Sequence, residues 1–305
     1  MVHSVISGAL KAFHHLQFGD LAELIQQKHL LGLKAALCIP TLNEEGTIAR
    51  IVETLRKALV DDHALLDELV VIDSGSTDRT RELAADAGAE VVLSSAILPF
   101  QGSRPGKGEN LWKAVHHCQS DLIAFVDGDI RNIHPRFVTG TLGPLLLDPE
   151  IAYVKGFYER PLLAREGVDP RGGGRVTEIL VRPLFDRFCP ELAALHQPLA
   201  GEYAARREIL EAIPFPTGYG VETAHLIDVW RRHGIRAIAQ TDLDERIHRN
   251  RSLADLGRMS DQILDAFLPR FLDPSSQRSE RPPMISVAEY RERFPAAAAR
   301  FRKSA

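Results

Sequence analysis

Short apolar runs alternate with helically spaced apolar positions between residues 35 and 126. Runs of this length are typical of buried strands, and apolar side chains recurring every three or four residues, as from Ile48 to Leu59, predict the inner face of a helix. Strands alternating with helices indicate βαβ units and an α/β fold with a mainly parallel sheet. The predicted strands are Ala35–Ile39, Glu68–Ile72, Glu90–Leu93 and Leu122–Val126, with helices after Ile48, from near Asp78 and at about Glu109–His117.

The pattern changes from about residue 151, where the chain looks built to complete a cleft. The basic, alanine-rich stretch Ser286–Lys303 is interpreted as a solvated or oligomer-packing helix. Further predicted elements are a strand at 151–158, helices at 176–187 and 221–233, and a strand at 235–240. The predicted divisions are an extension of one or two amphipathic helices (1–34), a Rossmann-like half (35–130), a second half of the same domain (131–272), and a polar linker with a helical tail (273–305).

Composition narrows the class of protein. A chain of 305 residues that is 45% hydrophobic and 26% charged is an ordinary soluble globular protein. Its net charge of −4 argues against nucleic-acid binding, and no apolar run approaches the roughly 18 residues of a membrane span. The N-terminus lacks the basic region of a signal peptide. Cys38, Cys118 and Cys189 are odd in number and widely spaced, which fits reduced thiols in the cytoplasm.

The strongest chemical signal is Asp127-Gly128-Asp129, directly after the predicted strand Leu122–Val126. Alternation along the strand sends both aspartates the same way, and ligands of open α/β sheets bind at this carboxyl edge. Two converging carboxylates repel unless a cation lies between them, and carboxylates favour hard cations such as Mg²⁺ or Mn²⁺. The competing interpretation is an ordinary turn, in which Asp-Gly-Asp is common.

Two other predicted strands end in polar motifs at the same edge. Pro40–Glu45 suits a nucleotide base and ribose, or it simply caps the next helix. Asp73–Asp78 offers a carboxylate to a base or ribose, with a helix cap again as the alternative. Arg104–Glu109 adds glycines for close backbone approach and Lys107 for a phosphate, but it lacks the spacing of a P-loop.

Together these four motifs resemble family-2-type GT-A nucleotide-sugar glycosyltransferases over about the first 130 residues. Motifs of the second half narrow the resemblance to glucosyl-3-phosphoglycerate synthases and the related mannosyl-3-phosphoglycerate synthases of the retaining GT81 group, over about residues 35–265. These motifs are Gly172–Glu178, Gln197–Tyr203, Gly218–Glu222 and Arg246–Asn250. The resemblance implies a GT-A fold, with nucleotide-sugar binding by residues 35–130 and acceptor binding by residues 131–272.

The resemblance also implies roles for single residues. Asp129 and His248 would ligate Mg²⁺ or Mn²⁺, a combination that leaves coordination sites for phosphate oxygens and water. From the residues alone, His248 is as well explained as a surface histidine in a charged run. The implied donor-binding residues are Pro40, Leu42, Glu44, Ser74, Lys107, Asp127, Gly128, Tyr219 and Glu222.

The acceptor, 3-phosphoglycerate, would be held by Gly174, Arg175, Val176 and Thr177, with help from Asn250. The physics agrees, because a helix N-terminus after a glycine run offers free amides to an anion and Arg175 adds a planar donor fork. The alternative is a plain helix start with a solvated arginine.

The implied chemistry is glucose transfer from a nucleoside diphosphate glucose to the 2-hydroxyl of 3-phosphoglycerate with retention. A double displacement needs a carboxylate below the anomeric carbon, and Glu222 is the candidate. We favour a front-face route, in which the diphosphate, neutralised by metal and Lys107, takes the acceptor proton. Glu222 would then orient the sugar, and the Leu199 carbonyl would stabilise developing positive charge.

Several alternatives stay open. The donor could carry UDP, ADP or GDP, and GDP-mannose would make a mannosyl-3-phosphoglycerate synthase. Another GT-A transferase with a lipid acceptor would normally show a membrane-directed segment, and a nucleotidyltransferase would need a glycine-rich loop where Pro40–Asn43 stands. A non-catalytic nucleotide-sugar-binding module conflicts with the presence of Asp129, Arg175 and His248. A homodimer is expected from the spare terminal helices.

Overall fold

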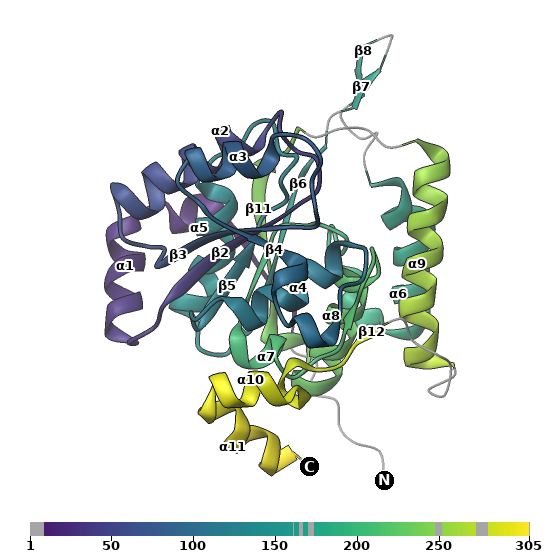
Figure 1. The fold of residues 1–305 in the computed structure, drawn as a ribbon. Helices are drawn as coiled ribbons and strands as arrows, with labels where there is room; N and C mark the ends of the chain where they lie inside the picture. Colours follow the sequence, from purple (N-terminus) through teal and green to yellow (C-terminus); the bar gives the residue numbers. More distant parts are fainter. Residues whose placement is uncertain are drawn as a thin grey trace.

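The computed structural model of the chain describes residues 9–160, 162–164, 167–169, 174–247, 252–272 and 280–304. Its centre is an eight-stranded sheet in the order β1-β11-β6-β9-β5-β2-β3-β4, in which β9 runs antiparallel to both neighbours and the other described pairs are parallel (Figure 1). The predicted α/β fold with a mainly parallel sheet is therefore confirmed. The sheet strands are β1 Lys11–His14, β2 Ala35–Thr41, β3 Glu68–Asp73, β4 Glu90–Leu93, β5 Leu122–Phe125, β6 Tyr153–Glu159, β9 Tyr203–Arg206 and β11 Ile238–Glu245.

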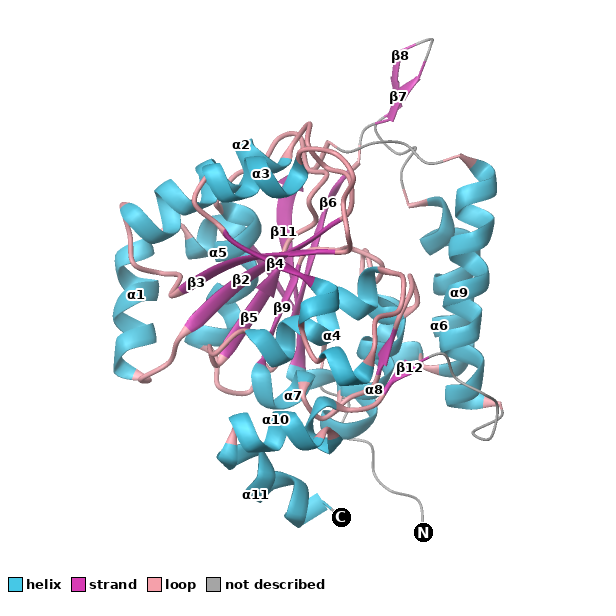
Figure 2. Cartoon of the chain, viewed as in Figure 1, coloured by secondary structure: helices cyan, strands magenta, loops and turns pink. Residues whose placement is uncertain are grey.

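Helices cover the sheet, and two short strand pairs lie outside it (Figure 2). The pairs are β7 Leu162–Ala164 with β8 Gly167–Asp169, and β10 Phe215–Pro216 with β12 Glu280–Arg281. The α-helices are α1 Leu21–Leu30, α2 Ile48–Arg56, α3 Thr80–Asp86, α4 Lys107–His117, α5 Arg136–Leu147, α6 Arg182–Phe188, α7 Arg207–Leu210, α8 Val221–His233, α9 Leu253–Phe271, α10 Ala288–Arg293 and α11 Pro295–Ser304. Short helical turns are η1 His15–Phe18, η2 Lys57–Asp61, η3 Ser94–Ala96, η4 Pro99–Gln101, η5 Thr177–Val181, η6 Pro190–Ala194, η7 Ile235–Ala237 and η8 Met284–Ser286.

The middle of the sheet is buried on both faces, so strands β2, β3 and β5 are mainly apolar. Along β2, Ala36 and Cys38 belong to one core cluster, whereas Leu37 and Ile39 belong to the other. The first cluster packs against α4, α8 and α9, and the second against α1, α2 and α5 (Figure 1). This double coverage explains why β2 and β3 are apolar runs rather than alternating apolar and polar residues.

Most predicted elements are present, with shifted ends. The helix at 221–233 has the predicted bounds, and the strands at 68–72 and 90–93 are confirmed as β3 and β4. The strand expected at 235–240 begins at Ile238 and continues to Glu245, because residues 235–237 form a short helical turn. Helices α5 and α9 and the antiparallel strand β9 were not predicted from the sequence.

The N-terminal extension is partly different from the prediction. Residues 21–30 form the expected helix α1, but Lys11–His14 form strand β1, which pairs in parallel with β11 at the edge of the sheet. The side chain of His15 lies 2.7 Å from Asp244, just beyond this pairing, and ties the extension to the end of β11. Residues 11–14 thus extend the central sheet.

The described part of the C-terminal segment also differs from the predicted linker and tail, because it packs against the domain. Arg281 of β12 makes two 2.7 Å hydrogen bonds to the buried carboxylate of Glu109 in α4. The indole of Trp112 donates to the carbonyl oxygen of Pro282 at 2.9 Å, and the buried hydroxyl of Tyr290 bonds to Glu211 at 2.6 Å. The interpretation of residues 286–303 as a solvated tail is therefore wrong for α10, which closes one side of the core.

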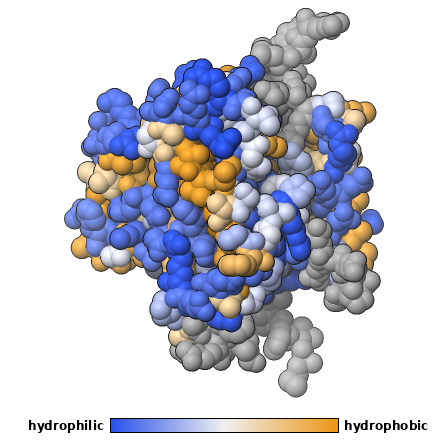
Figure 3. Space-filling view, in the orientation of Figure 1, coloured by the Kyte–Doolittle hydropathy of each residue, from blue (hydrophilic) through white to orange (hydrophobic). Residues whose placement is uncertain are grey.

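The face of the molecule seen in Figure 3 is mostly hydrophilic, with an apolar patch over the region of β4. Strand β4 is the last strand of the sheet, and its Val91, Val92 and Leu93 are only half-buried. Among the described helices, none has the length and apolar character needed to cross a membrane.

Candidate active site

A cavity of about 680 Å³ opens at the carboxyl edge of β2, β3 and β5, where open α/β sheets bind their ligands. Every predicted site residue that the structure describes lines it. His248 and Asn250, the predicted metal and acceptor ligands, lie outside the described residues. The residues brought together are Pro40, Leu42, Glu44, Ser74, Lys107, Asp127, Gly128, Asp129, Gly174, Arg175, Val176, Thr177, Leu199, Tyr219 and Glu222.

The motif after β3 builds the rim rather than offering its carboxylate to a ligand. Asp73 is fully buried, and its carboxylate accepts hydrogen bonds from the amides of Gly75 and Ser76 and from the hydroxyls of Thr41 and Ser76, at 2.5–3.1 Å. The carboxylates of Asp73 and Asp78 bond within the turn and to its neighbours, as the cap alternative expects, and neither residue lines the cavity. The adjacent Ser74 is exposed toward the cavity.

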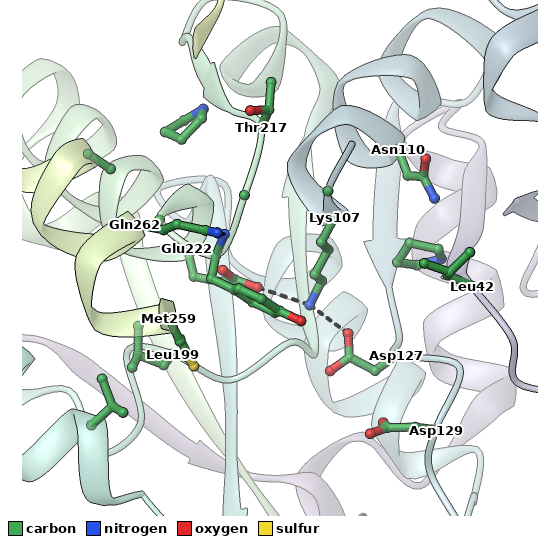
Figure 4. Close-up of a pocket in the computed structure, with 18 of the residues that line it drawn as sticks. Leu42, Lys107, Asn110, Asp127, Asp129, Leu199, Thr217, Glu222, Met259 and Gln262 are labelled. Carbon is green, nitrogen blue, oxygen red and sulfur yellow. Dashed lines mark hydrogen bonds and ion pairs between the residues drawn. The ribbon is translucent and has the colours of Figure 1, made fainter. Parts of the chain in front are cut away.

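Lys107 is the central cation of the cavity. Its ammonium lies 2.5 Å from a carboxylate oxygen of Asp127 and 2.9 Å from one of Glu222 (Figure 4). Burial alone would lower the pKa of Lys107, but the two carboxylates outweigh it and raise the pKa well above its usual range. Burial likewise opposes ionisation of Asp127, yet Lys107 and Arg246 hold its pKa well below the usual range. Lys107 is therefore a permanent positive charge between two carboxylates.

Arg246 is a charged residue of the cavity that sequence reasoning did not single out. One of its terminal nitrogens lies 3.0 Å from Asp127 and 2.6 Å from Asp129. Its other terminal nitrogen lies 2.8 Å from the Tyr158 hydroxyl and 3.3 Å from Glu202. The aspartate pair thus converges as predicted, and in this structure a guanidinium lies against both carboxylates. The sequence already indicated that the two aspartates need a cation between them. Arg246 is also the first residue of the Arg246–Asn250 motif noted in the sequence.

The charge balance of the site fits a divalent cation. Lys107 and Arg246 together carry two positive charges. They contact four carboxylates, those of Asp127, Asp129, Glu202 and Glu222, so negative charge is in excess in this cluster. Oxygen ligands of this kind suit Mg²⁺ and Mn²⁺. The Asp129 side chain is 28% exposed, so its carboxylate is accessible from the cavity.

A helix start forms the wall predicted to bind the acceptor. Gly174 has a left-handed backbone (φ +81°), and its carbonyl accepts from the amide of Glu178 at 3.1 Å, which closes the first turn leading into η5. Val176 and Thr177 are buried, and both line the cavity beside Arg175. The arrangement leaves the early amides of this helical segment at the cavity wall, where an anion is favoured.

Close backbone approach explains two glycines of the site. A Cβ on Gly108 would lie 1.8 Å from the Pro216 carbonyl oxygen, so glycine lets α4 approach the segment leading to Tyr219. A Cβ on Gly201 would lie 2.1 Å from the Asp127 carboxylate, so glycine lets the 197–201 loop lie against that aspartate. Substitution at either position would shift a predicted donor-binding residue.

The sequence matches the family described as Glycosyl transferase family 2 over residues 36–155. Together with the mainly parallel sheet and the acidic pair at its edge, this match defines the chain as a glycosyltransferase of the GT-A type.

More specific likenesses extend over nearly the whole chain. It is 45% identical over 312 residues to the glucosyl-3-phosphoglycerate synthase of Petrotoga mobilis, covering 93% of this chain and 96% of that protein. It is 47% identical over 239 residues to that of Mycolicibacterium smegmatis, covering 78% of each. The crystal structure of the Mycobacterium tuberculosis enzyme with Mn²⁺, UDP and glucosyl-3-phosphoglycerate superposes with a TM-score of 0.81 at 40% identity, covering 90% of this chain and 98% of that one. The chain belongs to the glucosyl-3-phosphoglycerate synthase family.

Proposed function

We propose that this protein transfers glucose from UDP-glucose to the 2-hydroxyl of 3-phosphoglycerate, with retention of the anomeric configuration. The observation that carries the proposal is the cluster of Lys107, Asp127, Asp129, Glu222 and Arg246 in one cavity of a chain from this family. UDP is favoured as the nucleotide because the Mycobacterium tuberculosis enzyme was crystallised with UDP and with UDP-glucose.

The donor would lie along the rim formed by Pro40, Leu42, Glu44 and Ser74, with its diphosphate toward Lys107. Lys107 is rigidly held by two carboxylates, so its positive charge needs no reorganisation when the leaving group develops negative charge. Glu222 would orient the glucose hydroxyls, and Gly128 and Tyr219 complete this side of the cavity.

Asp129 and His248, with support from Asp127, would hold Mg²⁺ or Mn²⁺. When bound, the cation supplies positive charge to the diphosphate and favours its departure. Complexes of the Mycobacterium tuberculosis enzyme with Mn²⁺ or Mg²⁺ and UDP support this assignment.

The acceptor would bind at the Gly174–Thr177 helix start, with Arg175 and Asn250 as further donors to its anionic groups. In the front-face route, the bond between the anomeric carbon and the diphosphate breaks while the acceptor 2-oxygen bonds to the same face. The acceptor proton passes to the departing phosphate oxygen, and the Leu199 carbonyl faces the developing positive charge.

We also infer a cytoplasmic homodimer. The described cysteines, Cys38, Cys118 and Cys189, are buried free thiols, which suits a reducing compartment. Leu30 and Leu31 at the end of α1 are exposed apolar side chains that a second subunit could cover. Light scattering on the purified protein measures the oligomeric state directly.

The test is a turnover assay with 3-phosphoglycerate and Mg²⁺, run in parallel with UDP-, ADP- and GDP-glucose and GDP-mannose. We expect an α-linked phosphorylated glucosylglycerate from UDP-glucose, identified by NMR and abolished by EDTA. If only GDP-mannose gives product, the transferred sugar is mannose and the assignment of glucose is wrong. If the enzyme hydrolyses a donor in a metal-dependent way but forms no glycosylated product with any donor, 3-phosphoglycerate is not the acceptor.

A further inference from the structure

A wholly buried lysine lies in the sheet beneath the active site. Lys155, in the middle of β6, is 1% exposed. Its ammonium donates a hydrogen bond to the carbonyl of Ala200, and it lies 5.1 Å from the centre of the Tyr203 ring. Burial lowers the pKa of Lys155 to about 8. A lysine in such a place is costly for stability, so its presence requires an explanation.

The side chain reaches the one loop that carries the predicted catalytic carbonyl. In this loop the Ala200 amide donates to the Gln197 carbonyl at 3.0 Å, forming a turn with Leu199 inside it. Strand β6 also holds the ends of the loop, because Gln197 bonds to the backbone of Tyr158 and the amide of Gly156 donates to the Glu202 carbonyl at 2.8 Å. Lys155 adds a third contact from β6 to this loop, at Ala200, between its two ends.

The charge of Lys155 is coupled to the active site. Glu222, Glu202 and Asp127 favour its charged form, whereas Lys107 opposes it. The titratable groups around it come from four elements and one loop: Lys107 of α4, Asp127 after β5, Tyr153 of β6, Glu202 and Tyr203 at the start of β9, and Glu222 and His225 of α8. His225 has a pKa well below its ordinary value, chiefly through burial, so it is neutral beside this charge.

We propose that Lys155 is a positioning residue for glucosyl transfer: its hydrogen bond to Ala200 fixes the adjoining Leu199 carbonyl at the cavity. This inference rests on the proposed function and names a residue beyond the site described above. The alternative, a purely structural lysine, predicts that its removal lowers the stability of the protein but leaves kcat of the folded enzyme unchanged.

The experiment compares Lys155→Met with the wild type and with Lys113→Met. Lys113 is the matched control, since it is also wholly buried and also donates to carbonyls, those of Ser94 and Gly102, but does not line the cavity. For Lys155→Met we expect a melting temperature lowered no further than in Lys113→Met, UDP affinity within about threefold, and kcat lowered at least tenfold. Lys113→Met should lose stability and keep kcat.

Two further measurements distinguish a positioning role of Lys155 from a purely structural role. The wild-type kcat/KM should fall as pH rises through about 8, because Lys155 then loses its charge and its hydrogen bond to Ala200 weakens, and this limb should be absent in Lys155→Met. Hydrogen exchange in the 197–203 peptide should be faster in the variant, while exchange in β6 is unchanged. Lys155→Arg, which keeps the charge, should restore part of kcat if Lys155→Met fails to fold.

Wild-type kcat in Lys155→Met, or loss of stability and UDP binding in step with kcat, would overturn the positioning role. A wild-type protein that transfers no glucose would refute the proposed function instead. The exchange of the 197–203 amides would still decide whether Lys155 holds the loop, because that measurement needs no turnover.

Discussion

Replacing Lys107 by methionine tests the electrostatic centre of the site. The variant loses an ammonium that lies 2.5 Å from Asp127 and 2.9 Å from Glu222. Asp127 keeps Arg246 as a partner at 3.0 Å, but Glu222 keeps no other ion pair among the described residues. Loss of one preorganised donor to developing negative charge costs about 3–4 kcal/mol in the transition state, or roughly 10²–10³ in kcat.

The assay measures kcat and KM for UDP-glucose at saturating 3-phosphoglycerate and Mg²⁺, together with the affinity for UDP. We expect the loss mainly in kcat, because Lys107 acts on charge that develops as the diphosphate leaves. Lys113→Met, on the same helix, controls for removal of a buried ammonium from α4. A Lys107→Met enzyme with kcat within about tenfold of wild type would refute the assignment of Lys107 to the leaving group.

Other predictions follow from the same contacts. Asp129→Ala should abolish metal-dependent turnover while circular dichroism and melting temperature stay near wild type. Arg246→Met should lower the free energy of unfolding of the metal-free protein by about 3–5 kcal/mol, and Mn²⁺ should offset part of that loss in urea titrations, since it neutralises the same carboxylates. Glu109→Gln should cost about 3 kcal/mol in the same titration, because Arg281 is left buried without its bidentate carboxylate. Burial lowers the pKa of His116 to about 4, so between pH 6.5 and 4 the unfolded chain binds a proton that the folded chain does not. The free energy of unfolding should therefore decrease as the pH is lowered through this range, and His116→Leu should reduce this dependence.

The rim of the cavity could be predicted because it follows from local geometry. Buried parallel strands are visible as apolar runs, and their carboxyl ends meet at one edge, so Pro40, Ser74 and Asp127 are brought together by the fold class alone. Strand β1 could not be recognised, since four residues of mixed polarity become a strand only by pairing with β11, over two hundred residues away. Residues 280–283 have the composition of a linker, and tertiary contacts to Glu109 and Trp112 give them structure.

The aspartate pair shows where local reasoning ends. Alternation along β5 predicts that Asp127 and Asp129 converge, and repulsion between them predicts a cation, but neither argument says where the cation comes from. Arg246 follows Asp129 by 117 residues in the sequence. It lies beside Asp129 because it follows β11, which belongs to the same sheet as β5 and is separated from it by β6 and β9. Tyr158 of β6 and Glu202 before β9 then hold the guanidinium from the two intervening strands. The order of strands therefore determines which charges meet, and strand order is the part of this fold that depends on long-range pairing rather than on any local pattern.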